Sequence, residues 1–290
     1  MSDTTEILAL GRMLPEGAPL YHYCLGGIGA RIVLPHREVK PFTCSTCYIG
    51  ELNVDPVVLS PFKVDTGRLL RLVDSWKPDF IFLDGIEPLE SAPSELLDGK
   101  PVAARTQGFT GIPDTVEALV YDVFPGKYRG ASPLRVRESL EEASSSGVHL
   151  EIVFYVETLR RAPLAPFLEP LRGDTIIHVE YQGQASIVKS EKLADSLKEN
   201  GFSFVYVRDS ERWIIDDTEC PVCGRKIVSR VNGIAVGYKV TPGSECGYCG
   251  SPLPFRRVCS RRNPGRDSMV KKGVSTEWVN PAGLGLTSHS

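Results

Sequence analysis

The fold is decided by a short apolar run and the loop that follows it, Arg31-Ile32-Val33-Leu34 and Lys40-Pro41-Phe42-Thr43-Cys44-Ser45-Thr46-Cys47. The run predicts a buried strand, and the loop carries two thiols separated by two residues. Two such thiolates can share one metal centre, and they suit zinc, copper(I) or an iron–sulfur cluster. The chemistry of this loop therefore depends on which residues supply the remaining ligands.

Beyond this loop, apolar runs alternate with segments of helical periodicity as far as residue 207. The strand-like runs are 30–34, 80–83, 101–105, 120–124, 148–156, 175–181 and 204–207; the helix-like segments are 66–76, 94–97, 115–119, 135–146, 166–171 and 191–200. This alternation predicts an α/β fold with a parallel sheet, closed or half-closed into a barrel. We expect a partial (βα)6 barrel over residues 20–212, preceded by a loose N-terminal arm over residues 1–19.

Polar residues follow most of the predicted strands. In barrels of this kind the chemistry sits on loops at the carboxyl ends of the strands. We therefore expect an active site at this edge, although a solvated rim would also be polar. The residues concerned are Cys44, Cys47, Glu87, Thr106, Gln107, Asp122, Glu157, Arg160 and Gln182.

Two cysteine knuckles mark the C-terminal part of the chain, Cys220-Pro221-Val222-Cys223-Gly224 and Cys246-Gly247-Tyr248-Cys249-Gly250. Four thiolates in two tight turns predict a closed, structural zinc site, with an iron site as the alternative. Between the knuckles, two strand-like runs across Asn232-Gly233 predict a β-hairpin. We assign residues 213–254 to a small zinc ribbon.

Charge is distributed unevenly along a chain of 290 residues whose formal charge is −3 and whose composition, 42% hydrophobic and 24% charged, is that of an ordinary globular protein. The segment 254–273 contains seven Lys/Arg and one acid, so the remainder is acidic. We expect residues 255–290 to form a flexible basic tail. Its arginines, Arg256, Arg257, Arg261 and Arg262, suit a phosphate backbone and predict RNA contact, although such runs are often merely solvated.

The expected cellular setting follows from three sequence features. No apolar run approaches the roughly 18 residues that a membrane span needs, and the first 17 residues do not have the pattern of a signal peptide. Six of the eight cysteines lie in C-x-x-C pairs. We therefore expect a cytoplasmic protein without membrane contact, whose cysteines bind metal rather than form a disulfide framework.

Taken in order, residues 20–255 resemble radical SAM enzymes, in the branch similar to pyruvate formate-lyase activating enzymes that ends in a zinc ribbon. Cys44 and Cys47 stand where the C-x-x-x-C-x-x-C cluster motif belongs, Gly85-Ile86-Glu87-Pro88 takes the place of Gly-Gly-Glu-Pro, and Thr106-Gln107-Gly108-Phe109 resembles the turn after the third strand. The resemblance implies a [4Fe–4S] cluster on three thiolates. It also implies S-adenosylmethionine (SAM) on the open iron, and radical chemistry on an unknown substrate, such as a glycyl protein or a nucleic-acid base.

Carried over residue by residue, the resemblance assigns Glu87 to the methionine ammonium and Thr106 and Gln107 to the cofactor site. Cys44 and Cys47 become cluster ligands, but Lys40 occupies the place of the first cysteine. Cys24 is the predicted substitute, because only Cys24 and Cys259 lie outside the C-x-x-C pairs. The chain is an enzyme if Cys24 completes the cluster. The alternative is a catalytically silent scaffold that binds RNA or a ribonucleoprotein through the ribbon and tail.

Overall fold

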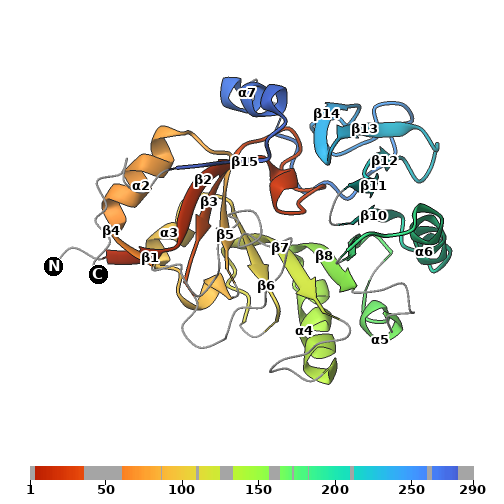
Figure 1. Cartoon of the computed structure of the whole chain (residues 1–290), viewed down its shortest axis with the longest axis horizontal. Helices are drawn as coiled ribbons and strands as arrows, with labels where there is room; N and C mark the ends of the chain where they lie inside the picture. Colours follow the sequence, from red (N-terminus) through yellow and green to blue (C-terminus); the bar gives the residue numbers. More distant parts are fainter. Residues whose placement is uncertain are drawn as a thin grey trace.

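The computed structural model of the chain describes ten segments, namely residues 4–35, 61–85, 87–108, 111–124, 133–156, 164–171, 173–181, 183–209, 212–259 and 263–279. Its centre is a ten-stranded sheet with the order β11-β10-β9-β8-β7-β6-β5-β3-β2-β15 (Figure 1). The sheet is mostly parallel and is flanked by helices, so the predicted α/β class is confirmed.

Seven consecutive strands of this sheet run parallel and follow the order of the chain. They are β3 (Gly29–Val33), β5 (Phe80–Asp84), β6 (Val102–Thr106), β7 (Val116–Val123), β8 (His149–Val156), β9 (Ile176–Tyr181) and β10 (Phe204–Arg208). Antiparallel strands complete the sheet at both sides, with β11 (Trp213–Ile215) next to β10 and with β2 (Ala9–Met13) and β15 (Thr276–Trp278) next to β3. In this order β11 and β15 are the two end strands.

Helices cover one face of the parallel strands. They are α2 (Thr66–Ser75), α3 (Ser94–Leu97), α4 (Pro133–Ser145), α5 (Ala165–Leu168) and α6 (Ile187–Glu199). Strands that follow one another with right-handed crossovers place all their helices on the same side of the sheet. Leu69, Leu140 and Leu197 of these helices share one buried core with Leu83 and Ile152 of the sheet. The Asp65 carboxylate accepts a hydrogen bond from the Arg68 N–H and so caps the first helix.

The predicted helix over residues 115–119 is wrong, because residues 116–119 belong to β7. Ala118 pairs in register with His149 of β8 and with Ala103 of β6. Ala, Glu and Leu favour helices, but pairing with two buried neighbouring strands outweighs that local preference. β7 is therefore one continuous strand of eight residues.

The other face of the sheet is covered by the two ends of the chain. Leu20, Tyr23 and Cys24 pack against Phe82 and Val153.

Where the sequence predicted a loose arm, residues 4–17 form β1 (Thr4–Ile7), β2 and a 3-10 turn (Pro15–Gly17). β1 pairs with β4 (Phe62–Asp65) in a separate two-stranded sheet.

The C-terminal segment is also ordered where a flexible tail was predicted. Residues Pro264–Lys272 form α7, and β15 pairs with β2 through Thr276 and Met13. Met269 is fully buried against Leu14 and Ile28. These contacts join residues that are about 250 positions apart in the sequence. They leave no local sequence pattern, so the order of this segment was not predicted.

A third sheet, of three strands, contains β12 (Thr218–Glu219), β13 (Lys226–Val231) and β14 (Ile234–Tyr238). The predicted hairpin is confirmed, since Asn232 and Gly233 both have positive φ, 51° and 76°, as a two-residue type I′ turn requires. Its apolar side, which includes Ile227, packs on Phe204 of β10. No helix in the described segments is both long and apolar enough to cross a lipid bilayer.

Candidate functional site

The four cysteines of the two knuckles form one cluster. The Sγ atoms of Cys220 and Cys249 are 3.7 Å apart, those of Cys223 and Cys246 are 3.8 Å apart, and all four lie within 4.8 Å of one another. Zinc–sulfur bonds of about 2.3 Å in a tetrahedron place sulfurs about 3.8 Å apart. The cluster can therefore hold a metal such as zinc.

Local backbone structure builds each knuckle. The Gly224 N–H donates to the Cys220 carbonyl, and the Gly250 N–H donates to the Cys246 carbonyl, at 2.9 and 2.8 Å. Gly224 and Gly250 have φ of 69° and 73°, in the left-handed region that glycine adopts without steric cost. The C-x-x-C-G spacing thus explains why both sulfurs of each knuckle point to a common centre.

The electrostatics of the cluster favour a bound cation. Burial would raise the pKa of the Cys220 thiol, but hydrogen bonds from Ser251 and from backbone N–H groups lower it to about 6. For Cys223, the Arg225 N–H lowers the pKa, yet burial and the three neighbouring sulfurs outweigh it and raise the pKa to about 11. Four adjacent thiolates repel one another, so full ionisation requires a metal ion between them.

The residues that the resemblance assigns to the cofactor lie together at the carboxyl edge of the sheet. The Thr106 hydroxyl donates to Glu87 Oε2 at 3.0 Å, and the Gln107 N–H donates to Glu87 Oε1 at 2.6 Å. The Gly108 N–H in turn donates to Thr106 Oγ1 at 2.9 Å. Glu87 is 2% exposed, so its carboxylate is held in a fixed position by the loops after β5 and β6. The sequence predictions for Cys44, Cys47, Glu157, Arg160 and Gln182 fall outside the described residues.

A belt of buried charged residues crosses the helix-free face at the same edge, and we call it the charge belt. Side chains alternate between the two faces of a strand, and the members occupy positions of β3, β5, β6, β7, β9 and β10 that face away from the helices. In β8, Tyr155 occupies the position that pairs with Glu180. The members are Arg31, Asp84, Arg105, Asp122, Glu180 and Arg208. Sequence reasoning identified only Asp122. The others could have been found as charged residues within otherwise apolar strands. They lie near the carboxyl ends of these strands, at positions that face away from the helices.

Distances within the charge belt show that opposite charges neighbour one another. Arg105 Nε lies 3.7 Å from Asp84 Oδ1 and 3.4 Å from Asp122 Oδ2. Arg208 Nε lies 2.6 Å from Glu180 Oε1 at the other side of the sheet. Buried charges are tolerated when they are paired in this way. The carboxyl edge of the sheet therefore contains buried, paired charges whose side chains hold one another in position.

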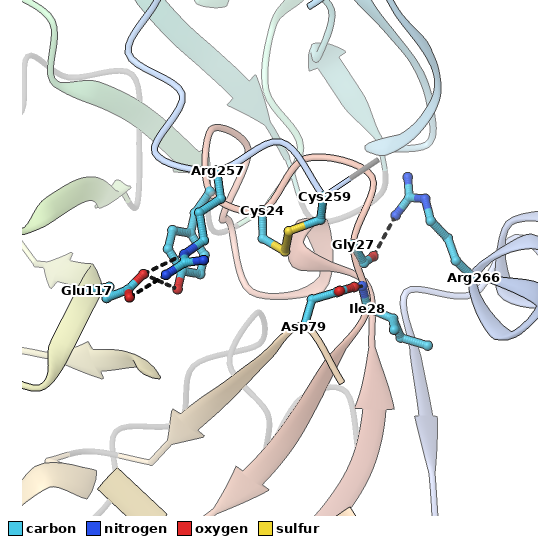
Figure 2. Close-up of a disulfide and its surroundings, with 9 residues drawn as sticks. Cys24, Gly27, Ile28, Asp79, Glu117, Arg257, Cys259 and Arg266 are labelled. Atoms are coloured by element: carbon cyan, nitrogen blue, oxygen red, sulfur yellow. Dashed lines mark hydrogen bonds and ion pairs between the residues drawn. A yellow bond between two sulfur atoms is a disulfide. The ribbon is translucent and has the colours of Figure 1, made fainter. Parts of the chain in front are cut away.

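Cys24 lies elsewhere, and it forms a disulfide with Cys259 (Figure 2). The Ile28 N–H donates to Asp79 Oδ2 at 3.0 Å, so the chain after Cys24 is attached to the residue that precedes β5. Both cysteines are thus at the amino-terminal edge of the sheet. Glu87 follows the opposite end of β5, and a five-residue strand separates its ends by about 13 Å.

The prediction that Cys24 completes an iron–sulfur cluster is therefore corrected. Its sulfur is bonded to Cys259 in this structure, and it lies at the edge of the sheet opposite Glu87. The turn after Cys24, closed by the Gly27 N–H on the Cys24 carbonyl at 2.8 Å and by a φ of 82° at Gly26, keeps this segment at the amino-terminal edge. Of the three thiolates that a [4Fe–4S] cluster with an open iron requires, the described residues supply none at the carboxyl edge.

The predicted RNA-contacting arginines differ in their surroundings. The Arg257 guanidinium donates two hydrogen bonds to the Glu117 carboxylate, one of them from Nε to Oε2 at 2.6 Å. Arg256 is exposed and borders a cavity of about 260 Å³, whose lining also includes Ser144, His149, Asp174, Thr175 and Phe255. Arg261 and Arg262 lie outside the described residues.

Beneath this cavity, the Glu151 carboxylate joins two strands to the N-terminal segment. His149 Nε2 and His178 Nε2 lie 3.1 and 2.8 Å from its two oxygens, and the N–H groups of Tyr21 and His22 each donate to it at 2.8 Å. Burial would raise the pKa of Glu151, but the two histidines outweigh burial and hold it well below its usual range. His149 and His178 are thus core histidines with a partner, as their position within strand runs suggested.

Comparison of the chain with family models, curated proteins and solved structures finds no match. The resemblance to radical SAM enzymes therefore rests on the motif residues alone. The candidate sites have to be interpreted from their own geometry.

Proposed function

We propose that this protein is a zinc-containing binding protein, built on a radical-SAM-like scaffold that does not carry out radical chemistry. In this proposal, the strands that follow one another from β3 to β10 correspond to a partial barrel, and the two knuckles with β12–β14 correspond to a zinc ribbon. The ligand is RNA or a ribonucleoprotein. The ribbon and the sheet share one apolar core, so we treat them as one binding protein.

The distribution of cysteines is the observation that carries this proposal. The chain has eight cysteines, of which four form the knuckle cluster and two form the disulfide. Cys44 and Cys47 are the two that remain. A [4Fe–4S] cluster that leaves one iron open for SAM needs three thiolates, and two thiolates do not satisfy that requirement. The four-cysteine cluster, by contrast, has the ligand number and the spacing of structural zinc.

Charge supports a polyanionic ligand at the C-terminal part of the molecule. Residues 213–290 contain eleven Lys/Arg and six Asp/Glu, whereas the rest of the chain has an excess of acids. Arg256 is exposed and lines the cavity described above. An exposed arginine at a cavity suits the phosphate group of a polyanion. Arg257 contributes less in this proposal, because Glu117 already neutralises it.

Metal analysis after anaerobic purification tests the first half of the proposal. We expect zinc in the protein, no brown colour, no more than trace iron, and no reductive cleavage of SAM. About four iron atoms per chain together with SAM cleavage would contradict it. A Cys220→Ser, Cys223→Ser double variant is the control, since it should lose the knuckle zinc without changing the iron content.

Binding of a fluorescent single-stranded RNA tests the second half. The observed affinity should fall with salt concentration, because phosphate neutralisation releases counterions. Arg256→Ala should weaken binding about tenfold, in the range of one lost hydrogen bond between charged groups. The matched control is Lys189→Ala, an exposed cation on α6 that does not line the cavity. Equal effects of the two changes, or no binding by the wild type, would contradict RNA as the ligand.

A second candidate function is the radical SAM chemistry that the resemblance implies. The arrangement of Glu87, Thr106 and Gln107 at the carboxyl edge favours it, because these residues meet where the family binds its cofactor. Glu87→Gln discriminates between the two candidates. It should abolish SAM binding in the enzyme and leave RNA binding unchanged in the binding protein.

A further inference from the structure

We propose that Cys24, Asp79 and Cys259 form a second metal site, which binds one zinc ion when the two thiols are reduced and is closed by the disulfide when they are oxidised. This inference does not depend on RNA binding or on the knuckle cluster. It concerns the two cysteines that lie outside the C-x-x-C pairs.

The three side chains converge from distant parts of the chain. Cys24 precedes β3, Asp79 precedes β5 and Cys259 follows the ribbon, yet one ligand atom from each lies within 4.8 Å of the others (Figure 2). Two thiolates and one carboxylate oxygen are a ligand set that zinc accepts, with water as the fourth ligand. Cys24 is fully buried, whereas Asp79 and Cys259 are partly exposed, so an ion has access from one side.

Backbone contacts hold the two cysteines together independently of the disulfide. The Leu25 N–H donates to the Arg257 carbonyl at 3.0 Å, and the Cys259 N–H donates to the Leu25 carbonyl at 2.8 Å. The ion pair between Arg257 and Glu117 anchors the same segment to β7. Breaking the sulfur–sulfur bond therefore leaves two thiols side by side, which is the arrangement that a metal site needs.

Asp79 and Gly27 fix the remaining geometry. The Ile28 N–H holds the Asp79 carboxylate beside the cysteine pair through Oδ2 at 3.0 Å. A Cβ at Gly27 would lie 2.3 Å from Cys24 Sγ and 3.0 Å from Cys259 Cβ, so only glycine leaves room for the pair. Arg266 Nη1 donates to the Gly27 carbonyl at 3.1 Å and holds this turn from the side of α7.

Conversion between the disulfide form and the dithiol form requires a reductant or an oxidant from solution. A phosphine reductant and one water molecule give up two electrons and two protons to the disulfide, which yields two thiols and a phosphine oxide. Zinc binding then releases both thiol protons to solvent, since only thiolates are ligands. Oxidation of the metal-free dithiol reverses the first step and needs an electron acceptor such as a small-molecule disulfide.

Zinc content in the two redox states tests the proposal. The chain is purified either with tris(carboxyethyl)phosphine or with oxidised glutathione, then dialysed against limiting free zinc. We expect about two zinc ions per reduced chain and about one per oxidised chain, the latter in the knuckles. Equal zinc content in both states would overturn the proposal, and so would a reduced protein with one zinc and two alkylatable thiols at positions 24 and 259.

Variants separate this site from the knuckles. Cys259→Ser and Asp79→Asn should each lower the zinc content of the reduced chain from about two to about one. Asp79→Asn keeps both cysteines and the hydrogen bond from the Ile28 N–H, so it can still form the disulfide. It therefore tests the site even where the Cys259→Ser variant folds poorly. Two zinc ions in reduced Asp79→Asn would remove Asp79 from the site and overturn the three-ligand proposal. Loss of RNA binding or a change in iron content would concern the proposed function and not this site.

Discussion

Arg31 and Asp84 form a buried ion pair between the neighbouring parallel strands β3 and β5. Arg31 Nε and Nη2 both donate to Asp84 Oδ2, at 2.8 and 2.6 Å, and the two side chains are 1% and 0% exposed. Burial would raise the pKa of Asp84, but Arg105 and Arg31 outweigh burial and hold it below its usual value. Asp84 therefore remains a carboxylate and anchors the charge belt.

The first prediction concerns the removal of that charge. Asp84→Asn should lower the free energy of unfolding by about 3–5 kcal/mol, because it leaves two buried guanidinium groups without their shared carboxylate. Urea denaturation at pH 7 measures this loss. The matched control is Asp74→Asn, whose exposed pair with Lys100 should contribute no more than about 1 kcal/mol. Similar losses in the two variants would show that the belt does not stabilise the fold through charge.

A second prediction follows from His22. It is fully buried, its Nε2 lies 2.6 Å from the Tyr206 hydroxyl, and its ring stacks on Phe255 with centroids 4.1 Å apart. Burial lowers the pKa of His22 well below its usual value, and this effect exceeds the opposing effect of Glu151. Since the unfolded chain binds a proton below about pH 6.5 and the folded chain does not, stability present at pH 7 is lost as the pH falls.

The expected size of the effect is about 1.4 kcal/mol per pH unit below pH 6.5 for this one group. His22→Phe retains the stacking on Phe255 but does not titrate. The difference in unfolding free energy between pH 7 and pH 5.5 should therefore be smaller in His22→Phe than in the wild type. An unchanged pH dependence would mean that His22 is protonated in the folded protein.

Much of the fold could be predicted from the sequence, because buried strands and amphipathic helices leave periodic patterns. The strand ending at Asp84 and the helix beginning at Thr66 are clear cases. The hairpin at Asn232-Gly233 and the knuckle cluster were also predictable, since tight turns require particular residues at fixed spacing.

The disulfide and the C-terminal strand β15 could not be predicted in the same way. Cys24 and Cys259 are 235 residues apart, and β15 pairs with β2 from the other end of the chain. Such contacts depend on the tertiary arrangement of segments whose local patterns are weak. The sequence placed Cys24 by analogy with a family motif, whereas the turn at Gly26 and Gly27 directs it to the other edge of the sheet.

A third prediction concerns removal of the knuckle metal. The ribbon and the sheet share a core in which Ile227 and Val228 contact Phe204 and Tyr206. Chelation should therefore destabilise β10 as well as the ribbon, because the ligand-bearing turns hold β13 against the sheet. Hydrogen exchange before and after treatment with a zinc chelator measures this. Cys249→Ala should reproduce the effect of chelation.

The control for that experiment is Val222→Ala, at an exposed position of the first knuckle that is not a ligand. It should leave the protection of β10 unchanged. Increased exchange confined to residues 218–250, with β10 unaffected, would contradict the coupling between ribbon and sheet.

The last prediction concerns Glu117 and Arg257, which join β7 to the segment after the ribbon. The hydrogen bonds from Arg257 outweigh burial and lower the pKa of Glu117. A lowered carboxyl pKa contributes stability above the unfolded value of about 4.3, and this contribution is lost as the pH falls through the folded value. Both side chains are partly exposed, at 26% and 42%, so solvent screening limits the pair to about 0.5–1 kcal/mol.

Glu117→Gln should therefore lower the unfolding free energy by that amount at pH 7 and have almost no effect at pH 3, where the wild-type carboxyl is protonated. A double-mutant cycle with Arg257→Gln isolates the pair, and Glu138→Gln on the exposed side of α4 is the control. A loss that is equal at both pH values would mean that Glu117 acts through packing. In that case the segment that carries Cys259 would be held to the sheet by its backbone hydrogen bonds, the disulfide and apolar packing, including that of Phe255.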